Sequence, residues 1–492
     1  MKKLSEIVSF KLPNDVEEQE VSYIYDDSRK VTNNSLFVAI NGSMENGEKY
    51  IDDALANGAR YIVLDSADKK NSVEIKDSGA IFIYVDNPRK ELSHIASKFF
   101  SHQLRSIVAV TGTNGKTSTV DIIRQIWAKN GKKSASVGTI GVITDNGTEK
   151  LSANLTSPGP IKMHKILSDM SSNCIDNVAL EASSHGINQH RLDNINFSVC
   201  AFTNMTTDHM DYHKTMENYW KAKERLFSEM ADKEAVFVVN SDDVFSKKIE
   251  LIAAARGIRC MSYGRSSQDL KIISVVPLEN GQQLEFSFLD ERHILNLPLY
   301  GTFQCYNSLC AIASCLCTGI PLDGILAALK ELRNIAGRLE LVTNVKSVKV
   351  FLDYAHTPDA LKNSIMSVRS YAKNRVVTVF GCGGNRDPQK RKAMGEVAEQ
   401  FSDFVFITDD NPRDEDPESI RKMIVEGFNG RKFIEVPTGR RNAIEAALEF
   451  ASNGDCVLVA GKGHESYQKF ANEELVYFSD RDVILDYYKA SK

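Results

Sequence analysis

Short apolar runs alternate with periodically apolar segments along this chain, which predicts an α/β fold. Apolar runs at 106–110, 177–182 and 197–203 have the length of buried parallel strands. The positions that repeat with helical spacing after the first run are Val120, Ile123, Ile126 and Trp127. Because alternating strands and helices are typical of doubly wound parallel sheets, residues 105–337 are expected to form such a domain.

Two further α/β blocks flank this central one. Residues 1–104 contain a helix-like run at 50–58 and strand-like runs at 35–40, 61–64 and 81–85. Residues 338–492 contain four strand-like runs, each followed by a loop rich in glycine or aspartate, at 349–352, 375–380, 404–408 and 456–459. Polar residues at the ends of successive parallel strands are where ligands bind in such sheets, so the last block is expected to be Rossmann-like.

Composition narrows the class of protein. The chain has 492 residues, of which 42% are hydrophobic and 25% charged, with a net charge of −5. This balance gives no nucleic-acid footprint, and no apolar run reaches membrane-spanning length. The N-terminus lacks a signal-like apolar core, so a cytoplasmic protein is expected. The cysteines expected to lie in the core of an apolar helix are Cys305, Cys310, Cys315 and Cys317.

The segment 111–119, TGTNGKTST, carries the strongest candidate chemistry. A glycine turn between a buried strand and a helix start presents N–H groups to an anion, Lys116 adds a charge, and the Thr117 hydroxyl can bind Mg²⁺. The spacing departs from the general phosphate-loop pattern, because only two residues separate Gly112 from Gly115. The alternative interpretation is a strand–helix turn that happens to contain glycines.

Carboxylates and histidines follow the next strands. Glu181 ends a strand and is expected to complete a Mg²⁺ shell, with a surface glutamate as the alternative. His209 and His213 have a zinc-like spacing, and a zinc hydrolase that also used His185 is an alternative. The segment 208–213 is expected to be a polar loop, with His209 facing a reacting phosphate. Read alone, the charged helix around Lys223 predicts a solvated lysine.

The order and spacing of nine motifs resemble the Mur ligases over essentially the whole chain. These motifs are TGTNGKTS, EASSHG, FTNMTTDHMDYH, YWKAKERLF, GTFQCYN, AGRLE, DYAHTPDAL, DNPR and GKGHE. The resemblance implies a cytoplasmic, ATP-dependent, amide-forming enzyme of peptidoglycan precursor synthesis. It implies three domains, at 1–104 for the UDP-sugar, 105–337 for ATP and 338–492 for the incoming amino acid. It further implies that a diamino acid is added to UDP-N-acetylmuramoyl-L-alanyl-D-glutamate by a monomer that binds small molecules, with no nucleic-acid partner and no membrane insertion.

The resemblance also implies site residues, first of all for ATP and Mg²⁺. The implied ATP site is Gly112, Thr113, Asn114, Gly115, Lys116, Thr117, Ser118, Asn307, Arg338, Asp353 and His356. The implied metal ligands are Thr117, Glu181, His209 and a carbamylated Lys223. Lys116, His209 and Lys223 would be catalytic. A carbamate turns a lysine cation into a carboxylate-like ligand, which gives Lys223 a role that its own charge does not.

Two substrate sites complete the implied set. The site for the UDP-sugar dipeptide is Ser28, Ser43, Met44, Glu45, Asn154, Leu155, Thr156, Ser157, Ser183, Gln189 and Arg191. Leu155 stands where a threonine is frequent in relatives, so its contact is expected through the backbone. The site for meso-diaminopimelate is Arg386, Asp410, Asn411, Pro412, Arg413, Gly461 and Glu465.

Arg413 carries the specificity argument, because its planar fork pairs with the second carboxylate that distinguishes diaminopimelate from lysine. Lanthionine also has this carboxylate, so L-lysine and lanthionine remain alternative amines. The tetrapeptide DNPR also occurs at 86–89, where it is expected to form a turn after a strand that ends at Val85. Folylpolyglutamate synthases share the phosphate loop, but the first domain and DNPR argue against them. A nucleotide-dependent binding or switch protein is the alternative of another class.

Overall fold

The computed structural model describes residues 1–42, 46–66, 71–149, 151, 156–345, 347–430 and 432–490. The chain divides into two compact units, which are described separately. The first contains residues 1–109, 132–200 and 222–235, and the second contains 110–131, 201–221 and 236–492. No helix in the described ranges has the length and apolar character needed to cross a membrane.

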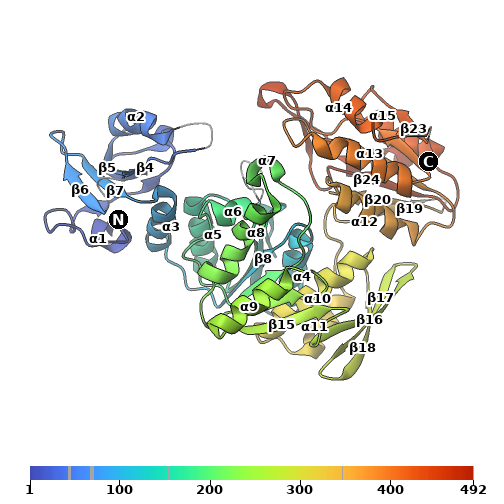
Figure 1. Cartoon of the computed structure of the whole chain (residues 1–492), viewed down its shortest axis with the longest axis horizontal. Coiled ribbons are helices and arrows are strands. Elements are labelled where there is room, and N and C mark those ends of the chain that lie inside the picture. Colours follow the sequence, from blue (N-terminus) through green and yellow to red (C-terminus); the bar gives the residue numbers. More distant parts are fainter. Residues whose placement is uncertain are drawn as a thin grey trace. The chain divides into compact units, whose positions relative to one another are not determined.

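The first unit begins with a five-stranded sheet in the order β3-β4-β5-β7-β6 (Figure 1). All its pairings are parallel except that of β6 with β7. Leu36 and Val38 pack with α1 and α3, while Phe37 packs on the opposite face with α2. This alternation follows from the two-residue period of a strand. The elements are β1 (Lys2–Lys3), α1 (Leu4–Ile7), β2 (Glu20–Val21), β3 (Ile24–Tyr25), η1 (Ser28–Lys30), β4 (Ser35–Val38), η2 (Gly47–Tyr50), α2 (Ile51–Ala56), β5 (Ala59–Asp65), β6 (Ser72–Ile75), β7 (Ile81–Val85) and α3 (Pro88–Phe99).

The rest of the first unit is built on strands in the order β11-β10-β9-β12-β8-β13. Strands β9 and β12 pair in parallel, and the amide of Ser198, just before β13, donates to the Ile107 carbonyl of β8 over 2.9 Å. The α8 helix ends in this unit and continues into η4, which is a π-helix. The elements are β8 (Ser106–Thr111), β9 (Ser134–Gly138), β10 (Gly141–Thr144), β11 (Gly147–Glu149), α5 (Pro160–Ser172), β12 (Asn177–Glu181), α6 (Ser184–Asn188), β13 (Val199–Phe202), α8 (Met216–Arg225) and η4 (Leu226–Met230).

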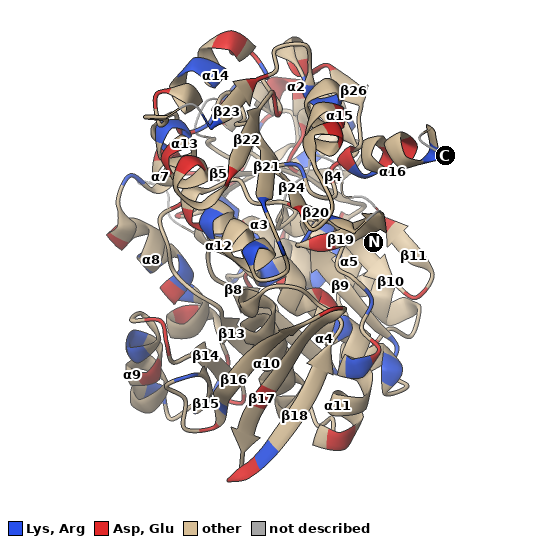
Figure 2. Ribbon diagram, turned by 90° about the vertical axis from the view of Figure 1, so that its right-hand side faces the viewer, with Lys and Arg blue, Asp and Glu red and all other residues tan. Residues whose placement is uncertain are grey.

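The second unit contains the C-terminal ends of β8 and β13. The strands that follow them in the sheet are, in order, β14-β15-β16-β17-β18. Strands β14 to β16 are parallel, whereas β16, β17 and β18 form an antiparallel meander whose last turn contains charged residues (Figure 2). The helix α10 is buried along most of its length. The elements are α4 (Lys116–Lys129), α7 (Met210–His213), β14 (Val236–Asn240), α9 (Ser246–Arg256), β15 (Arg259–Gly264), β16 (Leu270–Leu278), β17 (Gly281–Phe288), β18 (Glu291–Leu297), α10 (Thr302–Cys317) and α11 (Leu322–Lys330).

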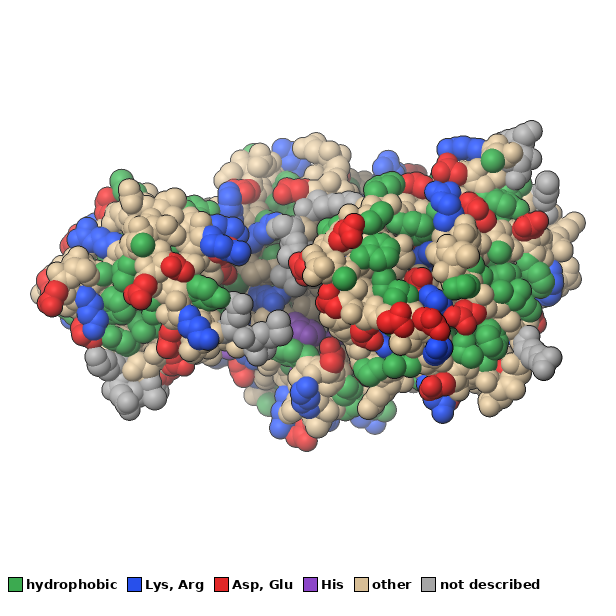
Figure 3. Space-filling view, turned by 90° about the horizontal axis from the view of Figure 1, so that it is seen from above, with side chains coloured by type: hydrophobic (Ala, Val, Ile, Leu, Met, Phe, Trp, Pro, Cys, Tyr) green, Lys and Arg blue, Asp and Glu red, His purple; other side chains and the backbone are tan. Residues whose placement is uncertain are grey.

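The C-terminal part of the second unit is a six-stranded sheet in the order β19-β20-β24-β21-β22-β23, parallel except for β19. Helices α12, α13 and α14 pack on one face and α15 and α16 on the other. In the space-filling view of the whole chain, lysine and arginine are interspersed with aspartate and glutamate (Figure 3). The elements are β19 (Glu340–Val345), β20 (Val348–Asp353), α12 (Pro358–Arg369), β21 (Val376–Phe380), α13 (Gln389–Phe401), β22 (Phe404–Ile407), α14 (Pro417–Val425), β23 (Phe433–Glu435), α15 (Arg440–Phe450), β24 (Cys456–Ala460), β25 (Tyr467–Lys469), η5 (Ala471–Glu473), β26 (Leu475–Tyr477) and α16 (Asp480–Ala490).

The α/β fold predicted from the apolar pattern is confirmed, and the predicted strands and the helix after the phosphate loop are present. Two local expectations are wrong. The segment 208–213, expected to be a loop, forms the helix α7 from Met210. Lys223, expected to be solvated, is 1% exposed. Cys305, Cys310 and Cys315 are buried as expected, while Cys317 is half-buried.

Candidate active site

The phosphate loop turns sharply between β8 and α4 because two glycines adopt positive φ angles. Gly112 has φ 146° and Gly115 has φ 88°. A Cβ on Gly115 would lie 2.3 Å from Asn307 Oδ1, so a side chain at this position would have to displace the Asn307 side chain of α10. Thr203 Oγ1 donates to the Asn114 carbonyl over 2.6 Å, and the Asn114 amide donates to Asn204 Oδ1 over 2.9 Å. The end of β13 therefore holds the loop in its curved form.

Lys116 and Arg338 bring positive charge to this loop. Lys116 Nζ donates to the carbonyls of Gly112 and Thr113 at 2.9 and 2.8 Å. The Arg338 guanidinium donates to Thr117 Oγ1 over 2.8 Å and stacks on the Tyr354 ring at 4.6 Å. Five residues predicted for the ATP site therefore lie together in the second unit, although Arg338 follows Thr117 by more than two hundred positions. They are Gly115, Lys116, Thr117, Asn307 and Arg338.

Asp353 and His356 follow β20 near Arg338. Burial raises the pKa of Asp353, against the opposing charge of Arg338. The Asp353 carboxylate accepts from the backbone amides of Leu339 at 2.6 Å and Ala355 at 2.9 Å. Burial and the charge of Lys390 lower the pKa of His356, whose Nδ1 lies 2.8 Å from the Tyr354 carbonyl. Asp353 therefore fixes the two loops that carry Arg338 and His356.

His209 has a backbone φ of 57°, in the left-handed region that non-glycine residues rarely occupy. Its ring contacts Tyr219 edge-on at 6.0 Å, and its Nε2 lies 3.4 Å from Asp208 Oδ2. Burial opposes ionisation of Asp208, but the charges of His209, His356 and Lys390 outweigh it and lower the Asp208 pKa. Strain of this kind is concentrated at functional sites. His209, predicted to face the reacting phosphate, is one of several non-glycine residues with a positive φ in the described part of the chain.

In the first unit, Glu181 has a buried carboxylate whose hydrogen bonds come from Thr139. It is 1% exposed, and its oxygens accept from the Thr139 amide at 2.8 Å and the Thr139 hydroxyl at 3.2 Å. Gly138 leaves room for this carboxylate, since a Cβ there would lie 2.1 Å from Glu181 Oε1. The alternative of a surface glutamate is thus wrong.

Two of the four residues proposed for a metal have the donor chemistry of Mg²⁺ ligands. Mg²⁺ prefers oxygen ligands, which the Thr117 hydroxyl and the Glu181 carboxylate supply. Lys223 is buried, so its terminal group faces protein rather than water. Among the described residues, no three or more His, Cys, Asp or Glu side chains gather in a group that could hold a metal ion.

A basic pocket of about 860 Å³ lies in the first unit. Gln189 and Arg191, both predicted for the sugar–peptide site, line it. The other basic side chains that line it are Lys30, Arg89, Lys162 and Lys165. Five cations against the single carboxylate of Asp26 make this pocket suited to a phosphorylated ligand.

Ser157 and Ser183 do not line this pocket themselves but are connected to it by Arg191, which does. Arg191 donates to the Ser157 carbonyl over 2.8 Å, and the two serine hydroxyls lie 3.0 Å apart. Thr156 contacts Thr139, with 3.2 Å between their hydroxyls. Ser28 is buried at the start of η1, and it is Lys30 of that turn that reaches the pocket. The three lysines of the pocket and Arg89 were not predicted from the sequence. Arg89 is the last residue of the first DNPR copy, and that copy was the signal for it.

Five residues predicted for the UDP-sugar site lie outside the described part of the chain. They are Ser43, Met44, Glu45, Asn154 and Leu155.

The C-terminal sheet carries a second charged cluster at the DNPR loop. Arg413 has φ 54°, and its guanidinium donates to the Gly384 carbonyl over 2.7 Å. Burial and the neighbouring charge of Arg386 lower the pKa of Arg413. Within the described ranges, neither arginine forms a salt bridge with a carboxylate. Two adjacent guanidiniums of this kind are suited to an anionic group of a ligand.

Asn411, Lys462 and Glu465 form the floor of this cluster. Lys462 Nζ lies 2.9 Å from Asn411 Oδ1 and 3.0 Å from Glu465 Oε2, and Asn411 donates to the same Glu465 oxygen over 2.9 Å. Although burial opposes it, the charges of Lys462 and Arg440 lower the pKa of Asp410. A Cβ on Gly461 would lie 2.7 Å from Asp410 Oδ2. The predicted diaminopimelate residues are thus brought together, and Lys462 joins them.

Three protein-family models match this chain in succession. The Mur ligase family, catalytic domain matches residues 20–100, the Mur ligase middle domain matches 110–315, and the Mur ligase, glutamate ligase domain matches 337–463.

Curated relatives match nearly end to end. A protein of Agrobacterium fabrum named UDP-N-acetylmuramoyl-L-alanyl-D-glutamate--2,6-diaminopimelate ligase is 41% identical, over 94% of this chain and 92% of its own. Proteins with the same name from Rhizobium meliloti and Clostridioides difficile are 40% and 36% identical, over 97% and 94% of this chain and 96% and 94% of their own.

Solved structures agree with the fold. A structure of a ligase with this name is 28% identical with a TM-score of 0.69, covering 100% of this chain and 99% of that one. The MurF ligase of Thermotoga maritima, in complex with ADP, has a TM-score of 0.64 at 17% identity, over 95% and 97% of the two chains. The matched domains, the end-to-end relatives and the phosphate loop lead to one conclusion: this chain belongs to the Mur ligase family.

Proposed function

We propose that this protein is an ATP-dependent amide ligase that adds meso-2,6-diaminopimelate to UDP-N-acetylmuramoyl-L-alanyl-D-glutamate in cytoplasmic peptidoglycan precursor synthesis. The observation that carries the proposal is the contact between Arg338 and Thr117 at the phosphate loop, which gathers two cationic side chains where ATP phosphates would lie. The names of the end-to-end relatives support the substrates.

The reaction would proceed through an acyl phosphate. An oxygen of the D-glutamyl carboxylate attacks the γ-phosphorus of ATP, and the bond to the ADP oxygen breaks. The amine of diaminopimelate then attacks the acyl carbon, the C–N bond forms, a proton leaves the nitrogen and phosphate departs. Lys116 and Arg338 would stabilise the charge that spreads over the transferred phosphoryl group.

Mg²⁺ would neutralise phosphate charge at this site, as it does in other phosphoryl transfers. Thr117, Glu181, His209 and Lys223 are the proposed residues around it. For Lys223 the proposal includes carbamylation: its neutral amine adds to CO₂, an N–C bond forms and one proton is released. The burial of Lys223 supports this role, because the resulting carboxylate would be shielded from water.

The UDP-sugar would bind in the basic pocket of the first unit. The five cations there would neutralise the charge of the diphosphate. Gln189 and Arg191 extend the site toward Ser157 and Ser183. The amine substrate would bind at the DNPR loop, where Arg386 and Arg413 offer two guanidiniums to its distal carboxylate. L-lysine lacks that carboxylate and would leave both cations without an anion, which is costly when they are partly buried.

The test is phosphate release by the purified protein with ATP, Mg²⁺ and UDP-N-acetylmuramoyl-L-alanyl-D-glutamate. Parallel reactions contain meso-diaminopimelate, L-lysine, lanthionine or no amine. Release that depends on diaminopimelate, with a product heavier by that residue, supports the proposal. Release with lysine alone keeps the ligase and rejects the assignment of Arg413. Release that ignores every amine supports a nucleotide-dependent switch instead. Lys116→Ala should abolish turnover in the same assay.

A further inference from the structure

Arg225 closes the helix that carries Lys223. It is the last residue of α8, two positions after Lys223, and the chain continues directly into the π-helix η4. A π-helix has a wider turn than an α-helix and occurs mostly as a single turn, frequently at functional sites. The π-turn that begins after Arg225 therefore sets how α8, with Lys223 on it, is rotated relative to the chain that follows.

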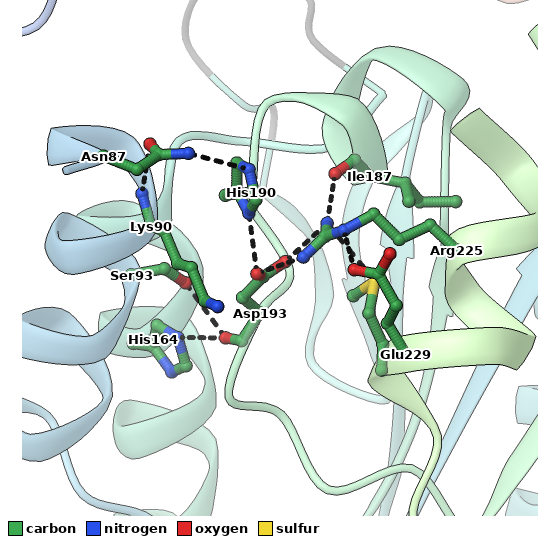
Figure 4. Close-up of polar contacts among 10 residues, drawn as sticks. Asn87, Lys90, Ser93, His164, Ile187, His190, Asp193, Arg225 and Glu229 are labelled. Carbon is green, nitrogen blue, oxygen red and sulfur yellow. Dashed lines mark hydrogen bonds and ion pairs between the residues drawn. The ribbon is translucent and has the colours of Figure 1, made fainter. Parts of the chain in front are cut away.

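The Arg225 guanidinium fastens this junction to three neighbours (Figure 4). It forms a two-pronged ion pair with Asp193, in which Nη1 lies 2.9 Å from Oδ1 and Nη2 contacts Oδ2. Nη1 also donates to the Ile187 carbonyl of α6 over 2.7 Å, and Nε donates to Glu229 of η4 over 2.7 Å. A bidentate arginine–carboxylate pair fixes orientation as well as distance.

Asp193 extends the same network to the start of α3. Its Oδ2 also accepts from His190 Nδ1 over 2.8 Å, and His190 Nε2 lies 3.3 Å from the Asn87 side-chain amide (Figure 4). Asn87 is the N-cap of α3, where its Oδ1 accepts from the Lys90 amide. The Asp193 carbonyl accepts from Ser93 Oγ, one turn further along α3, over 3.0 Å. Asp193 is 6% exposed, so water competes little for these bonds.

Two members of this network, Asn87 and His190, adjoin the basic pocket through their chain neighbours. On the α3 side, Arg89 and Leu92 line the pocket within the first turns after Asn87. On the other side, Gln189 and Arg191 line it from the two positions that flank His190. A ligand that orders these side chains therefore acts on the backbone that holds His190 and Asn87.

We propose that Asp193 is a positioning residue that couples occupancy of the basic pocket to the placement of Lys223, through Arg225 on one side and through His190 and Asn87 on the other. The role of Lys223 in this inference rests on the proposed ligase function. Asp193 touches no reacting atom in this scheme and acts only through the α8–η4 junction.

The chain offers a matched control for breaking an arginine–aspartate pair. Asp455, just before β24, accepts from Nε and Nη2 of Arg375 and is 1% exposed. Asp193→Asn and Asp455→Asn each remove one buried carboxylate charge from a two-pronged pair, so both should lower the melting temperature. Only Asp193→Asn is expected to disturb Lys223.

The first readout is steady-state ligation. Asp193→Asn should lower kcat about tenfold or more, since small misplacements of a catalytic group have effects of this size, while the KM for ATP changes little. Asp455→Asn should leave kcat within about twofold of the wild-type value. Equal kcat in the two variants, at equal loss of melting temperature, would overturn the inference. A wild-type protein without amine-dependent phosphate release would instead reject the proposed function.

The second readout does not need turnover. Amide hydrogen exchange is compared with and without UDP-N-acetylmuramoyl-L-alanyl-D-glutamate. In the wild type, ligand should slow exchange in both 88–95 and 222–230. In Asp193→Asn it should slow exchange in 88–95 alone. Protection of 222–230 that survives the substitution overturns the coupling.

If Asp193→Asn does not fold, the variant Asn87→Ser tests the coupling instead. Serine also caps helices, so α3 keeps its cap while the amide that reaches His190 is removed. Ligand-induced protection of 222–230 should weaken in this variant. Wild-type protection would overturn the proposal.

Discussion

Lys462 and Glu465 form an ion pair in which the lysine side chain is completely excluded from solvent, with Nζ 3.0 Å from Oε2. Asn411 donates to the same carboxylate oxygen, so two donors fix the orientation of Glu465. The GKGHE motif thus supplies both the carboxylate and the cation that holds it, three positions apart. A carboxylate held in this way is ready to receive an ammonium group of an amino-acid substrate.

Lys462→Met is expected to raise the KM for meso-diaminopimelate at least about tenfold, which corresponds to about 1.4 kcal/mol of binding. Methionine fills a similar volume but leaves Glu465 and Asn411 without their shared cation. The KM for ATP should stay near its wild-type value. Initial rates measured while each substrate is varied in turn provide the check.

The control for that substitution is Lys469→Met. Lys469 pairs with the exposed Glu473, and only its backbone amide contacts Asn411, so the substitution leaves the floor of the site intact. A rise in the diaminopimelate KM as large as that of Lys462→Met would contradict the assignment.

Arg413→Lys should reduce discrimination between diaminopimelate and lysine. The substitution keeps the charge but removes the planar fork, and the two cations differ most at bidentate sites. We expect kcat/KM for meso-diaminopimelate to fall by about tenfold to a hundredfold, in line with losing about 1.5–3 kcal/mol of charge-assisted hydrogen bonding. Competition between the two amines, with products separated by mass, measures the ratio directly.

Arg421→Lys serves as its counterpart. Arg421 lies in α14 and pairs with Asp409, the residue before the DNPR loop, and with Glu435 of β23. It is not among the residues predicted for the amine site, so the substitution should affect stability rather than the choice of amine. If Arg413→Lys leaves the ratio of products unchanged, the distal carboxylate binds elsewhere.

Gly115→Ala should lower ATP-dependent turnover by at least about a hundredfold, because close packing at a catalytic loop tolerates little displacement. The new methyl group would meet Asn307 Oδ1 and displace this side chain, which is itself predicted for the ATP site. Gly131→Ala is the matched substitution: it lies just after α4 at φ 72°, but nothing lies within 4 Å of its Cβ position. It should cost about 1–2 kcal/mol of stability from backbone strain and leave turnover unchanged. Nucleotide titration and phosphate release distinguish these effects. Similar turnover in both variants would argue against the assignment of the phosphate loop to ATP.

His164 should make the protein less stable in mild acid. Burial, followed by the nearby His102, lowers the pKa of His164 to about 4, and its Nε2 lies 3.2 Å from the Asp193 carbonyl. A lowered histidine pKa means that stability is complete above the unfolded-state pKa and is lost as the pH falls toward the folded-state value. Between about pH 7.5 and about pH 5 this group should remove about 2 kcal/mol of unfolding free energy. In urea titrations, His164→Gln should show a correspondingly smaller loss, and an unchanged loss would contradict the assignment.

The two DNPR copies show what the sequence alone resolves and what it does not. After β7, Asn87 caps α3 and Pro88 is its first residue, so the expected turn after Val85 is also a helix start. After β22, Arg413 adopts a left-handed backbone, its amide bonds to the Lys469 carbonyl, and α14 begins only at Pro417. Identical letters take different conformations because contacts distant in sequence decide the second case. The strands, by contrast, were predictable from local apolar runs.

Lys223 shows a second limit. Its helix is polar in sequence, and the burial of one lysine in such a segment depends on which elements pack over it, which a periodic pattern does not reveal. The three lysines and Arg89 of the basic pocket were missed for a similar reason. Its cations come from separate turns and helices, at Lys30, Arg89 and Lys162, and no spacing in the sequence relates them.

The π-turn of η4 makes the orientation of α8 sensitive to the deletion of a single residue. A π-turn is equivalent to one residue inserted in an α-helix. Loss of a single codon between Leu226 and Met230 would therefore restore a regular helix without creating a gap, and would rotate the preceding turn by about 100° relative to the chain after Met230. The lysine would then point along another face of an intact helix. In-frame single-codon deletions here should yield folded, inactive protein, whereas deletions in exposed turns should be silent.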